Sequence, residues 1–227
     1  MINLYYTICD TWLSDEDVHA LLSILPHNEQ KQNSRYRRWQ DRQIHLIGRL
    51  LLLHGLVERG LSPNSLEGFR TTSFGKPFIN NAIVFNLSHS SKAVVCAVTD
   101  RGQIGIDVET IKEIDFSWYK SVMSDEEWLA IESAKDQKKS FFEYWTKKEA
   151  VIKGDGRGLR VPLKQIQFKE NFAVLSGTKW SIKRIDLGNP FICHLVIDRS
   201  DDKIVKKELK TDELRWVFQH VLSPSTL

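Results

Sequence analysis

Apolar residues recur along the first quarter of the chain with the period of amphipathic helices. Residues three and four apart are apolar over 18–25 and again over 44–57, which predicts two helices. Ser14 is placed to cap the first helix and Pro26 to end it, whereas Gly60 follows the end of the second. The basic segment KQNSRYRRWQDR leads into the second helix.

Short apolar runs separated by turn residues fill most of the remaining sequence and predict strands. A strand is expected at 2–9, and a meander of antiparallel strands at 83–87, 93–98 and 104–109. Two more helices, four more strands and a closing helix are expected, in that order, at 125–134, 137–153, 166–175, 180–187, 191–197, 203–209 and 212–222.

Helices and short strands therefore occur in similar proportions in both halves of the chain. This pattern predicts an α+β fold with two similar lobes of about a hundred residues, each a mainly antiparallel sheet packed with helices. We expect an N-terminal lobe at 1–103, a C-terminal lobe at 104–222 and a flexible tail at 223–227.

Composition narrows the classes of function only slightly. The chain has 227 residues and a net charge of +3, too mild to indicate nucleic acid as a partner. Its longest apolar run is too short to span a bilayer, so we expect no membrane association. Three isolated cysteines and an N-terminus unlike a signal peptide indicate a cytoplasmic protein with reduced thiols.

Two carboxylates alternate with apolar residues in the segment GIDVE. In a strand, Ile106 and Val108 would face the core, and Asp107 and Glu109 would share the other face about 7 Å apart. Two like charges so placed repel each other unless solvent or a cation relieves them. The segment is therefore either a strand with one wet face or part of a cation site.

A third carboxylate interrupts an apolar stripe on the helix expected at 137–153. Phe142, Trp145, Glu149 and Ile152 lie along one face at helical spacing. A carboxylate at the edge of a core needs a partner, because losing its water is costly. The partner is either Lys153, one turn on, or a metal shared with the two carboxylates of GIDVE; three carboxylates suit magnesium.

Two other segments place polar or flexible residues together. FNLSHS delivers Ser88 and His89 at the end of a strand, where they would either form local turn bonds or contact phosphates. GDGRGL lacks the pattern of a phosphate-binding P-loop, and a helix stop followed by a turn, with Gly154 as the cap, is the stronger interpretation.

Four segments in this order, FGKP, FNLSHS, GIDVE and FFEYWTKKEAVIKGDGRGL, resemble the 4′-phosphopantetheinyl transferases of the Sfp-like class. The resemblance implies two α+β lobes related by a pseudo-twofold axis, acting as a monomer, with coenzyme A and Mg²⁺ in the cleft between them. It implies transfer of the phosphopantetheine arm to a serine of an apo acyl or peptidyl carrier protein, with release of adenosine 3′,5′-bisphosphate.

Carried over by motif, the resemblance assigns roles to individual residues. Asp107, Glu109 and Glu149 match the magnesium ligands, Glu149 also being the candidate acceptor of the serine proton, directly or through water. The other matches are Lys153 beside the pyrophosphate, the phosphate contacts Ser88 and His89, and Lys76 and Pro77 beside the nucleotide.

The sequence departs from the family where many relatives carry an arginine that holds the 3′-phosphate. Ile44 occupies that position here, so the expected substitutes are either Lys31, Arg35 and Arg38 or His45. The carrier is expected to land near 123–128 by analogy, on apolar contacts from Val122, Met123 and Trp128.

Two alternatives to carrier modification stay open from the sequence. One is another magnesium-dependent transferase that acts on a nucleotide, which would need the carboxylates but not FNLSHS and WTKKEA together. The other is a non-catalytic, carrier-binding relative of the enzyme.

Overall fold

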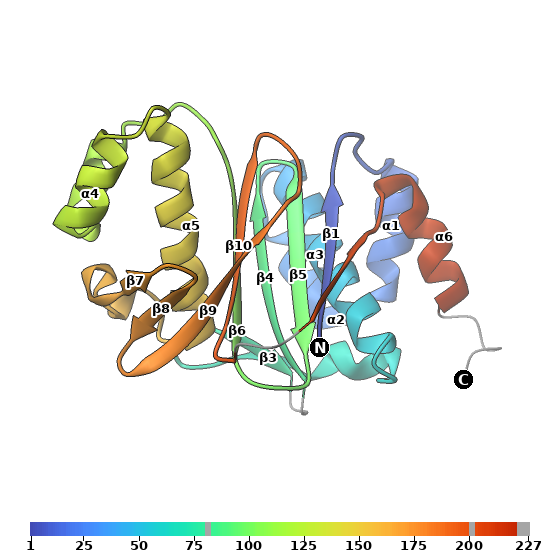
Figure 1. Cartoon of the computed structure of the whole chain (residues 1–227). Coiled ribbons are helices and arrows are strands. Elements are labelled where there is room, and N and C mark those ends of the chain that lie inside the picture. The colour runs from blue at the N-terminus through green and yellow to red at the C-terminus, as the bar shows by residue number, and fades with distance from the viewer. Residues whose placement is uncertain (80–82, 200–202, 222–227) are drawn as a thin grey trace.

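Two sheets form the centre of the molecule, and helices cover their outer faces (Figure 1). The computed structural model describes residues 1–79, 83–199 and 203–221. The first sheet has the strand order β11-β1-β5-β4, antiparallel except for the parallel pair of β1 and β11. Its strands are β1 (Ile2–Ile8), β4 (Val84–Ser90), β5 (Ala93–Thr99) and β11 (Ile204–Glu208).

The second sheet is antiparallel throughout and has the order β6-β10-β9-β8-β7. Its strands are β6 (Ile104–Thr110), β7 (Gln167–Lys169), β8 (Phe172–Leu175), β9 (Thr178–Ile185) and β10 (Phe191–Ile197). A small hairpin of β2 (Phe69–Thr71) and β3 (Pro77–Ile79) stands apart from both.

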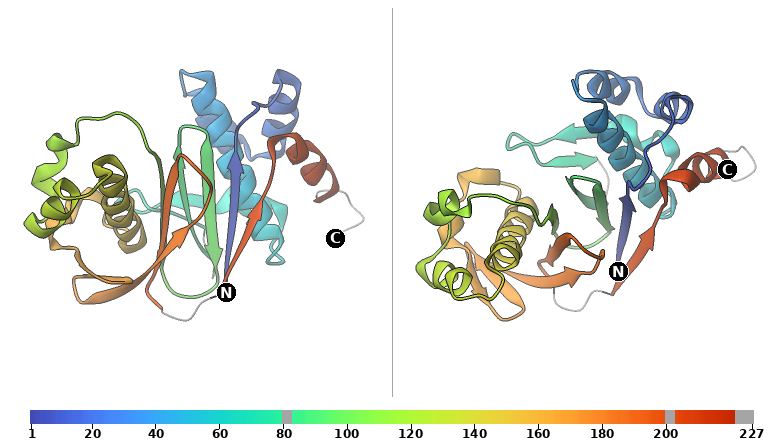
Figure 2. Two further views of the ribbon diagram at one scale, coloured as in Figure 1. Left: turned by 45° about the horizontal axis from the view of Figure 1, so that its top comes forward. Right: turned by 90° about the horizontal axis from the view of Figure 1, so that it is seen from above.

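The helices fall into two groups on opposite sides of the sheets, as the view from above shows (Figure 2). On the side of the first sheet lie α1 (Asp15–Ile24), α2 (His27–Ser34), α3 (Trp39–Val57) and α6 (Thr211–Val221). On the side of the second lie α4 (Asp125–Glu132) and α5 (Gln137–Asp155). Short 3₁₀ turns complete the fold: η1 (Pro63–Gly68), η2 (Phe116–Val122), η3 (Gly158–Arg160) and η4 (Leu163–Gln165).

The core follows this layering because each central strand buries both faces. The leucines of α3 pack on one face of β1 and β5. The opposite faces of these strands pack against the Ile104, Ile106 and Val108 face of β6, between the two sheets. The far face of the second sheet carries α5. The expected α+β fold of antiparallel sheets packed with helices is thus observed.

Most predicted elements are confirmed, and Ser14 caps α1 by accepting a hydrogen bond from the amide of Asp17. The predicted meander is wrong at its third strand. β4 and β5 pair, but β6 leaves them after the turn at residues 100–103 and pairs with β10. A strand of either sheet would show the same alternation, so the sequence pattern does not tell them apart.

The last part of the chain crosses back to the first lobe. β11 pairs with β1, and α6 packs beside α1. The expected lobe boundaries, 1–103 and 104–222, stay a prediction. The expected tail at 223–227 lies outside the described residues. The pseudo-twofold relation between the lobes stays a prediction.

All three cysteines are buried and unpaired, as expected: Cys9, Cys96 and Cys193. Among the described residues, no helix combines the length and apolar character needed to cross a membrane.

Candidate active site

Side chains, rather than backbone, join the two sheets where the edge strands β4 and β6 meet. Alternate residues of FNLSHS on β4 point toward β6 and accept hydrogen bonds from its backbone amides. The pairs are Asn86 with Ile106, Ser88 with Val108 and Ser90 with Thr110, at 2.8, 3.3 and 3.1 Å. These side chains satisfy edge amides that would otherwise be unpaired. The polar strand end predicted from sequence is therefore a seam between sheets.

The seam fixes Asp107 at the centre of the candidate site. Its Oδ1 accepts hydrogen bonds from the Ser88 hydroxyl at 2.9 Å and the Lys153 ammonium at 2.6 Å. Its Oδ2 is buried and has no hydrogen-bond partner among the residues that the structure describes. A buried carboxylate oxygen without a donor is costly unless a cation meets it. This oxygen is therefore available as a ligand.

Glu109 and Glu149 border the same space from β6 and α5. The Ser90 hydroxyl donates to Glu109 Oε2 at 2.7 Å. Burial raises the pKa of Glu149, and the charges of Asp107 and Glu109 raise it further. Burial also raises the pKa of Glu109, with Asp107 adding to the effect and Ser90 opposing it. The three carboxylates therefore border one space, and the charge of Asp107 disfavours ionisation of the two glutamates.

Two glycines allow α5 to lie close enough to β6 for this meeting. A Cβ atom on Gly105 of β6 would lie 2.0 Å from the carbonyl oxygen of Ala150 and 2.4 Å from the amide nitrogen of Gly154. A Cβ on Gly154 would in turn lie 2.7 Å from the ring of Trp180. Any larger side chain at either glycine would push α5 away from the sheet.

Together these residues line the carboxylate cavity, about 330 Å³ in volume. Its lining comprises Leu87, Ser88, His89, Asp107, Glu109, Trp145, Glu149 and Lys153. In the described part of the chain, no three His, Cys, Asp or Glu side chains are arranged as a complete metal site. Lys153, one of the two partners considered for Glu149 from sequence, lines this cavity and pairs with one oxygen of Asp107.

A second cavity, of about 260 Å³, continues from the first and contains Lys76 and Pro77. It shares Leu87, Glu149 and Lys153 with the carboxylate cavity. Lys76 donates to the carbonyl of Gly154 at 2.7 Å and to Gln103 at 3.0 Å. Burial lowers the pKa of Lys76.

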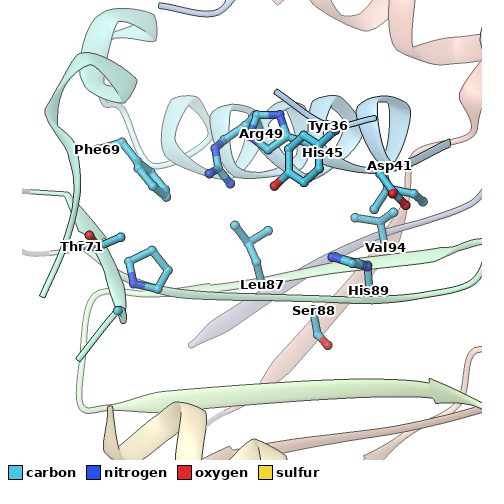
Figure 3. A pocket seen from close by; sticks show the side chains of 14 residues that line it. Tyr36, Asp41, His45, Arg49, Phe69, Thr71, Leu87, Ser88, His89 and Val94 are labelled. Carbon is cyan, nitrogen blue, oxygen red and sulfur yellow. The ribbon is translucent and has the colours of Figure 1, made fainter. Parts of the chain in front are cut away.

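A third cavity, here called the α3 cavity, lies on the opposite side of β4 and has a volume of about 510 Å³. Figure 3 shows Leu87 and His89 pointing from the strand toward α3, whereas Ser88 points the other way. Burial lowers the pKa of His89, and Lys153 lowers it further. Leu87 borders all three cavities, which therefore adjoin one another and are here together called the cleft.

Beside the α3 cavity lies a group of hydrogen-bonded and ion-paired side chains that the sequence analysis did not predict. Arg49 Nε lies 2.5 Å from Glu29 Oε2, and its guanidinium lies 4.1 Å from the centre of the Phe69 ring. His45 Nδ1 bonds Asn33 at 3.1 Å, and His45 Nε2 lies 3.6 Å from Glu29. Burial alone would raise the pKa of Glu29, but His45 and Arg49 outweigh it and lower that pKa.

This group forms because Glu29 belongs to an unpredicted helix, α2, which begins before the basic segment and overlaps its first residues. Ile44 and His45 line the α3 cavity, whereas Lys31 and Arg35 are exposed and line none of the three cavities. The expected role of Lys31 and Arg35 in binding the 3′-phosphate stays a prediction.

Two smaller expectations are wrong. Helix α5 continues through Gly154, and Gly156 caps it with φ of +86° and an amide that donates to Ile152. GDGRGL is nevertheless a helix stop with a turn.

The apolar contacts expected for the carrier are also misplaced. Met123 and Trp128 are 1% and 7% exposed, because both pack on α5, and only Val122 is partly exposed. Trp118 and Leu129, at 82% and 65% exposure, are the apolar residues that face solvent in this region.

Known proteins resemble this chain over most of its length. The model of the 4′-phosphopantetheinyl transferase superfamily matches residues 103–196, and a model for the N-terminal part of a 4′-phosphopantetheinyl transferase matches residues 11–101. The 4′-phosphopantetheinyl transferase gsp of Aneurinibacillus migulanus is 36% identical over 75% of this chain and 73% of its own. The 4′-phosphopantetheinyl transferase Sfp of Bacillus subtilis is 30% identical over 71% and 74%.

Proposed function

Because the chain belongs to the 4′-phosphopantetheinyl transferase superfamily, we propose that it transfers the phosphopantetheine arm of coenzyme A to a serine of an apo carrier protein. The observation that carries this proposal is the cleft around Leu87, in which the matched motif residues gather. The serine oxygen forms a bond to the β-phosphorus of the pyrophosphate. The bond from that phosphorus to the bridging oxygen breaks, and adenosine 3′,5′-bisphosphate leaves.

The residues present fit a magnesium ion at the carboxylate cavity. Among the described residues, Asp107 offers a buried oxygen without a hydrogen-bond donor, and burial together with the charge of Asp107 raises the pKa values of Glu109 and Glu149. Hard cations favour such carboxylate oxygens, and magnesium completes its shell with water and phosphate oxygens. Magnesium would supply positive charge against the pyrophosphate oxygens, which must be neutralised before a nucleophile approaches.

Glu149 is the proposed acceptor of the serine proton, directly or through a water molecule. Burial and its acidic neighbours raise its pKa, which makes its carboxylate a stronger base. Lys153 lies within hydrogen-bond distance of Ser88 and Asp107 on the same wall, where its ammonium is placed to stabilise negative charge on the departing bisphosphate.

The remaining cleft offers groups of suitable chemistry for the nucleotide. The α3 cavity is large, and its lining includes His45, Arg49, Ser88 and His89, which can donate to phosphate oxygens. Pro77 lines both the α3 cavity and the second cavity, and Lys76 lines the second. We assign coenzyme A to this cleft.

The cleft is formed within a single chain, which favours a monomer. Three buried, unpaired cysteines fit a reducing, cytoplasmic compartment. We propose acyl or peptidyl carrier domains as the protein partners, and neither nucleic acid nor a membrane.

Incubation with coenzyme A, Mg²⁺ and a panel of apo carrier proteins tests the proposal. Intact mass spectrometry should show some carriers gaining one phosphopantetheine arm, and chelation of the metal should prevent the gain. Carriers whose acceptor serine is replaced by alanine are the control. A panel that gains no mass under any metal condition would reject the transfer reaction.

Calorimetry with coenzyme A and with ATP distinguishes the proposed function from the first alternative, another nucleotide-dependent transferase. Preferential binding of coenzyme A supports the proposal, whereas preferential binding of ATP would indicate another nucleotide-dependent transferase. Tight binding of apo carriers without any mass gain would indicate the non-catalytic relative.

A further inference from the structure

A buried polar group ties α5 to the second sheet beside the carboxylate cavity. His194 on β10 is 1% exposed. Its Nε2 lies 3.1 Å from Glu143 Oε2, and its Nδ1 lies 2.7 Å from Thr146 Oγ1. Both partners lie on α5, so one imidazole connects the strand to two successive turns of the helix. We call these three residues the His194 clamp.

The clamp requires a defined state of the ring. Burial lowers the pKa of His194, and the Glu143 carboxylate opposes that effect only in part, which leaves the ring neutral near pH 7. A carboxylate only accepts, so Nε2 carries the hydrogen of the Glu143 contact. The Thr146 hydroxyl has a single hydrogen, and its Oγ1 lies 2.7 Å from both His194 Nδ1 and the carbonyl oxygen of Phe142. Arg184 on β9 lies 3.6 Å from Glu143 and adds a further link. Two directional contacts of this kind fix both the height and the rotation of a helix.

The position of the clamp connects it to the proposed ligand Asp107. His194 and Asp107 are directly opposite each other in the β10–β6 ladder, so their side chains share the sheet face that α5 covers. Thr146 lies three residues before Glu149, about 4.5 Å along the helix. It also lies seven residues before Lys153, on the same face of the helix. A shift of α5 at Thr146 therefore moves both functional side chains relative to Asp107.

A second contact holds the other half of α5. There, Gly105 approaches the backbone of Ala150 and Gly154 closely, as described above. Between this contact and the clamp, α5 is held on both sides of Glu149. Without the clamp, the first half of α5 would be held by apolar packing and by the ion pairs of Lys138 with Glu113 and of Glu143 with Arg184. Solvent-exposed ion pairs contribute little, and apolar packing resists sliding less than directional hydrogen bonds do.

We propose that His194 is a positioning residue, which with Glu143 and Thr146 sets the placement of Glu149 and Lys153 against Asp107. It touches neither substrate nor metal in this assignment and acts through α5. The proposal rests on the proposed function. Outer partners that orient metal ligands typically change metal affinity by about 10- to 100-fold when removed, which gives the size of effect to expect.

The decisive measurement is the dissociation constant of Mg²⁺ from the protein–coenzyme A complex, obtained by calorimetry, together with kcat and the KM for coenzyme A. His194→Leu should weaken Mg²⁺ binding by about 10- to 100-fold. It should lower kcat by about tenfold or more, because small misplacements of reacting groups are costly. The KM for coenzyme A should change much less. His194→Gln, whose amide can donate to Glu143, should restore part of the Mg²⁺ affinity.

His54→Leu is the matched control. His54 is also buried and pairs with a glutamate, Glu58, at 3.0 Å, but it lies on α3 and lines none of the cavities. This variant should lose thermal stability to a similar degree and keep the Mg²⁺ dissociation constant and kcat of the natural protein. Comparing the two variants distinguishes a general loss of packing from a loss of the placement of Glu149 and Lys153.

Thr146→Val keeps the side-chain volume and removes the contact with His194 Nδ1 together with the hydroxyl's own bond to the Phe142 carbonyl within α5. It carries the test if His194→Leu does not fold. Several-fold weaker Mg²⁺ binding in this variant supports the clamp. Folded His194→Leu or Thr146→Val protein with unchanged Mg²⁺ affinity and kcat would overturn it. Absence of carrier modification by the natural protein would instead count against the proposed function, since Mg²⁺ and coenzyme A binding are measured without a carrier.

Discussion

The two sides of β4 handle buried charge in opposite ways. Toward β6 and α5, three carboxylates surround one cavity, and Lys153 is the cation among its lining residues. Toward α3, the buried carboxylate of Glu29 lies against both Arg49 and His45. Buried ions need partners in either case. The difference suggests that side chains of the protein itself compensate the buried charge on the α3 side, whereas a bound ligand compensates the charges in the carboxylate cavity.

The largest effect is expected from removing a charge on the carboxylate side of β4. Glu149→Gln keeps the shape of the side chain and removes its charge. Transfer of the arm should fall by about 10²–10³-fold, because a preorganised charged group is lost. The midpoint of thermal unfolding in chelator should rise, since burial and two carboxylates oppose ionisation of Glu149. Mass spectrometry of the carrier and a thermal melt measure the two effects.

Asp107→Ala should also abolish transfer, and an active Asp107→Ala enzyme would remove Asp107 from the proposed metal site. A fall in the melting midpoint of Glu149→Gln would show that its charge is compensated after all.

On the α3 side, the same kind of change should act on stability. Arg49→Ala leaves Glu29 buried and charged without its nearest cation. Removing one partner of a buried pair costs about 3–5 kcal/mol of unfolding free energy. Urea denaturation measures this cost, and adding Glu29→Gln should recover much of it. A double variant no more stable than Arg49→Ala would contradict the pairing.

A smaller effect is expected where α5 approaches β6. Gly105→Ala would place its Cβ atom against the backbone of Ala150 and Gly154, so the helix must shift. Overpacking of this kind costs about 1–3 kcal/mol. Mg²⁺ binding should weaken as well, because Glu149 moves with the helix. Gly177→Ala is the control: its φ of +81° also strains the chain, but a Cβ there meets nothing within 4 Å.

The smallest expected effect is the pH dependence of stability that His54 on α3 contributes. Burial lowers the pKa of His54; Lys207 adds to this and Glu58 opposes it. A depressed pKa means that the stabilising contribution of His54 is present above the pKa of the unfolded chain, about 6.5, and is lost as pH falls through the folded value. The unfolding free energy of the natural protein should therefore fall more than that of His54→Leu between about pH 7.5 and 5.5. Parallel curves for the two proteins would contradict this.

Local patterns predicted much of the fold because they reflect local physics. The helical spacing, the Ser14 cap and the alternation in GIDVE were sufficient to place α1, α3 and β6. The strand partners were not predictable, since the alternation of β6 would suit a third strand of the first sheet equally well. The sequence also gave no sign that β11 would return to pair with β1.

The candidate site divides in the same way. Asp107, Glu109, Glu149 and Lys153 were found from periodicity and from motif resemblance, and the structure places all four around one cavity. The Glu29–Arg49 pair was missed because its two members are 20 residues apart along the chain. The His194 clamp was missed because His194 lies at least 48 residues from both of its partners on α5. The only sign of either group in the sequence was a single polar residue within an apolar stretch.

By itself, the sequence determined which residues carry acidic, basic and flexible character, and which face of each helix or strand bears them. Tertiary structure alone decided that the hydroxyls of β4 replace a backbone ladder, that one oxygen of Asp107 has no donor, and that His194 ties α5 in place. Periodicity fixes the direction of a side chain from its own backbone. What that side chain meets depends on how distant elements pack, which no local pattern encodes.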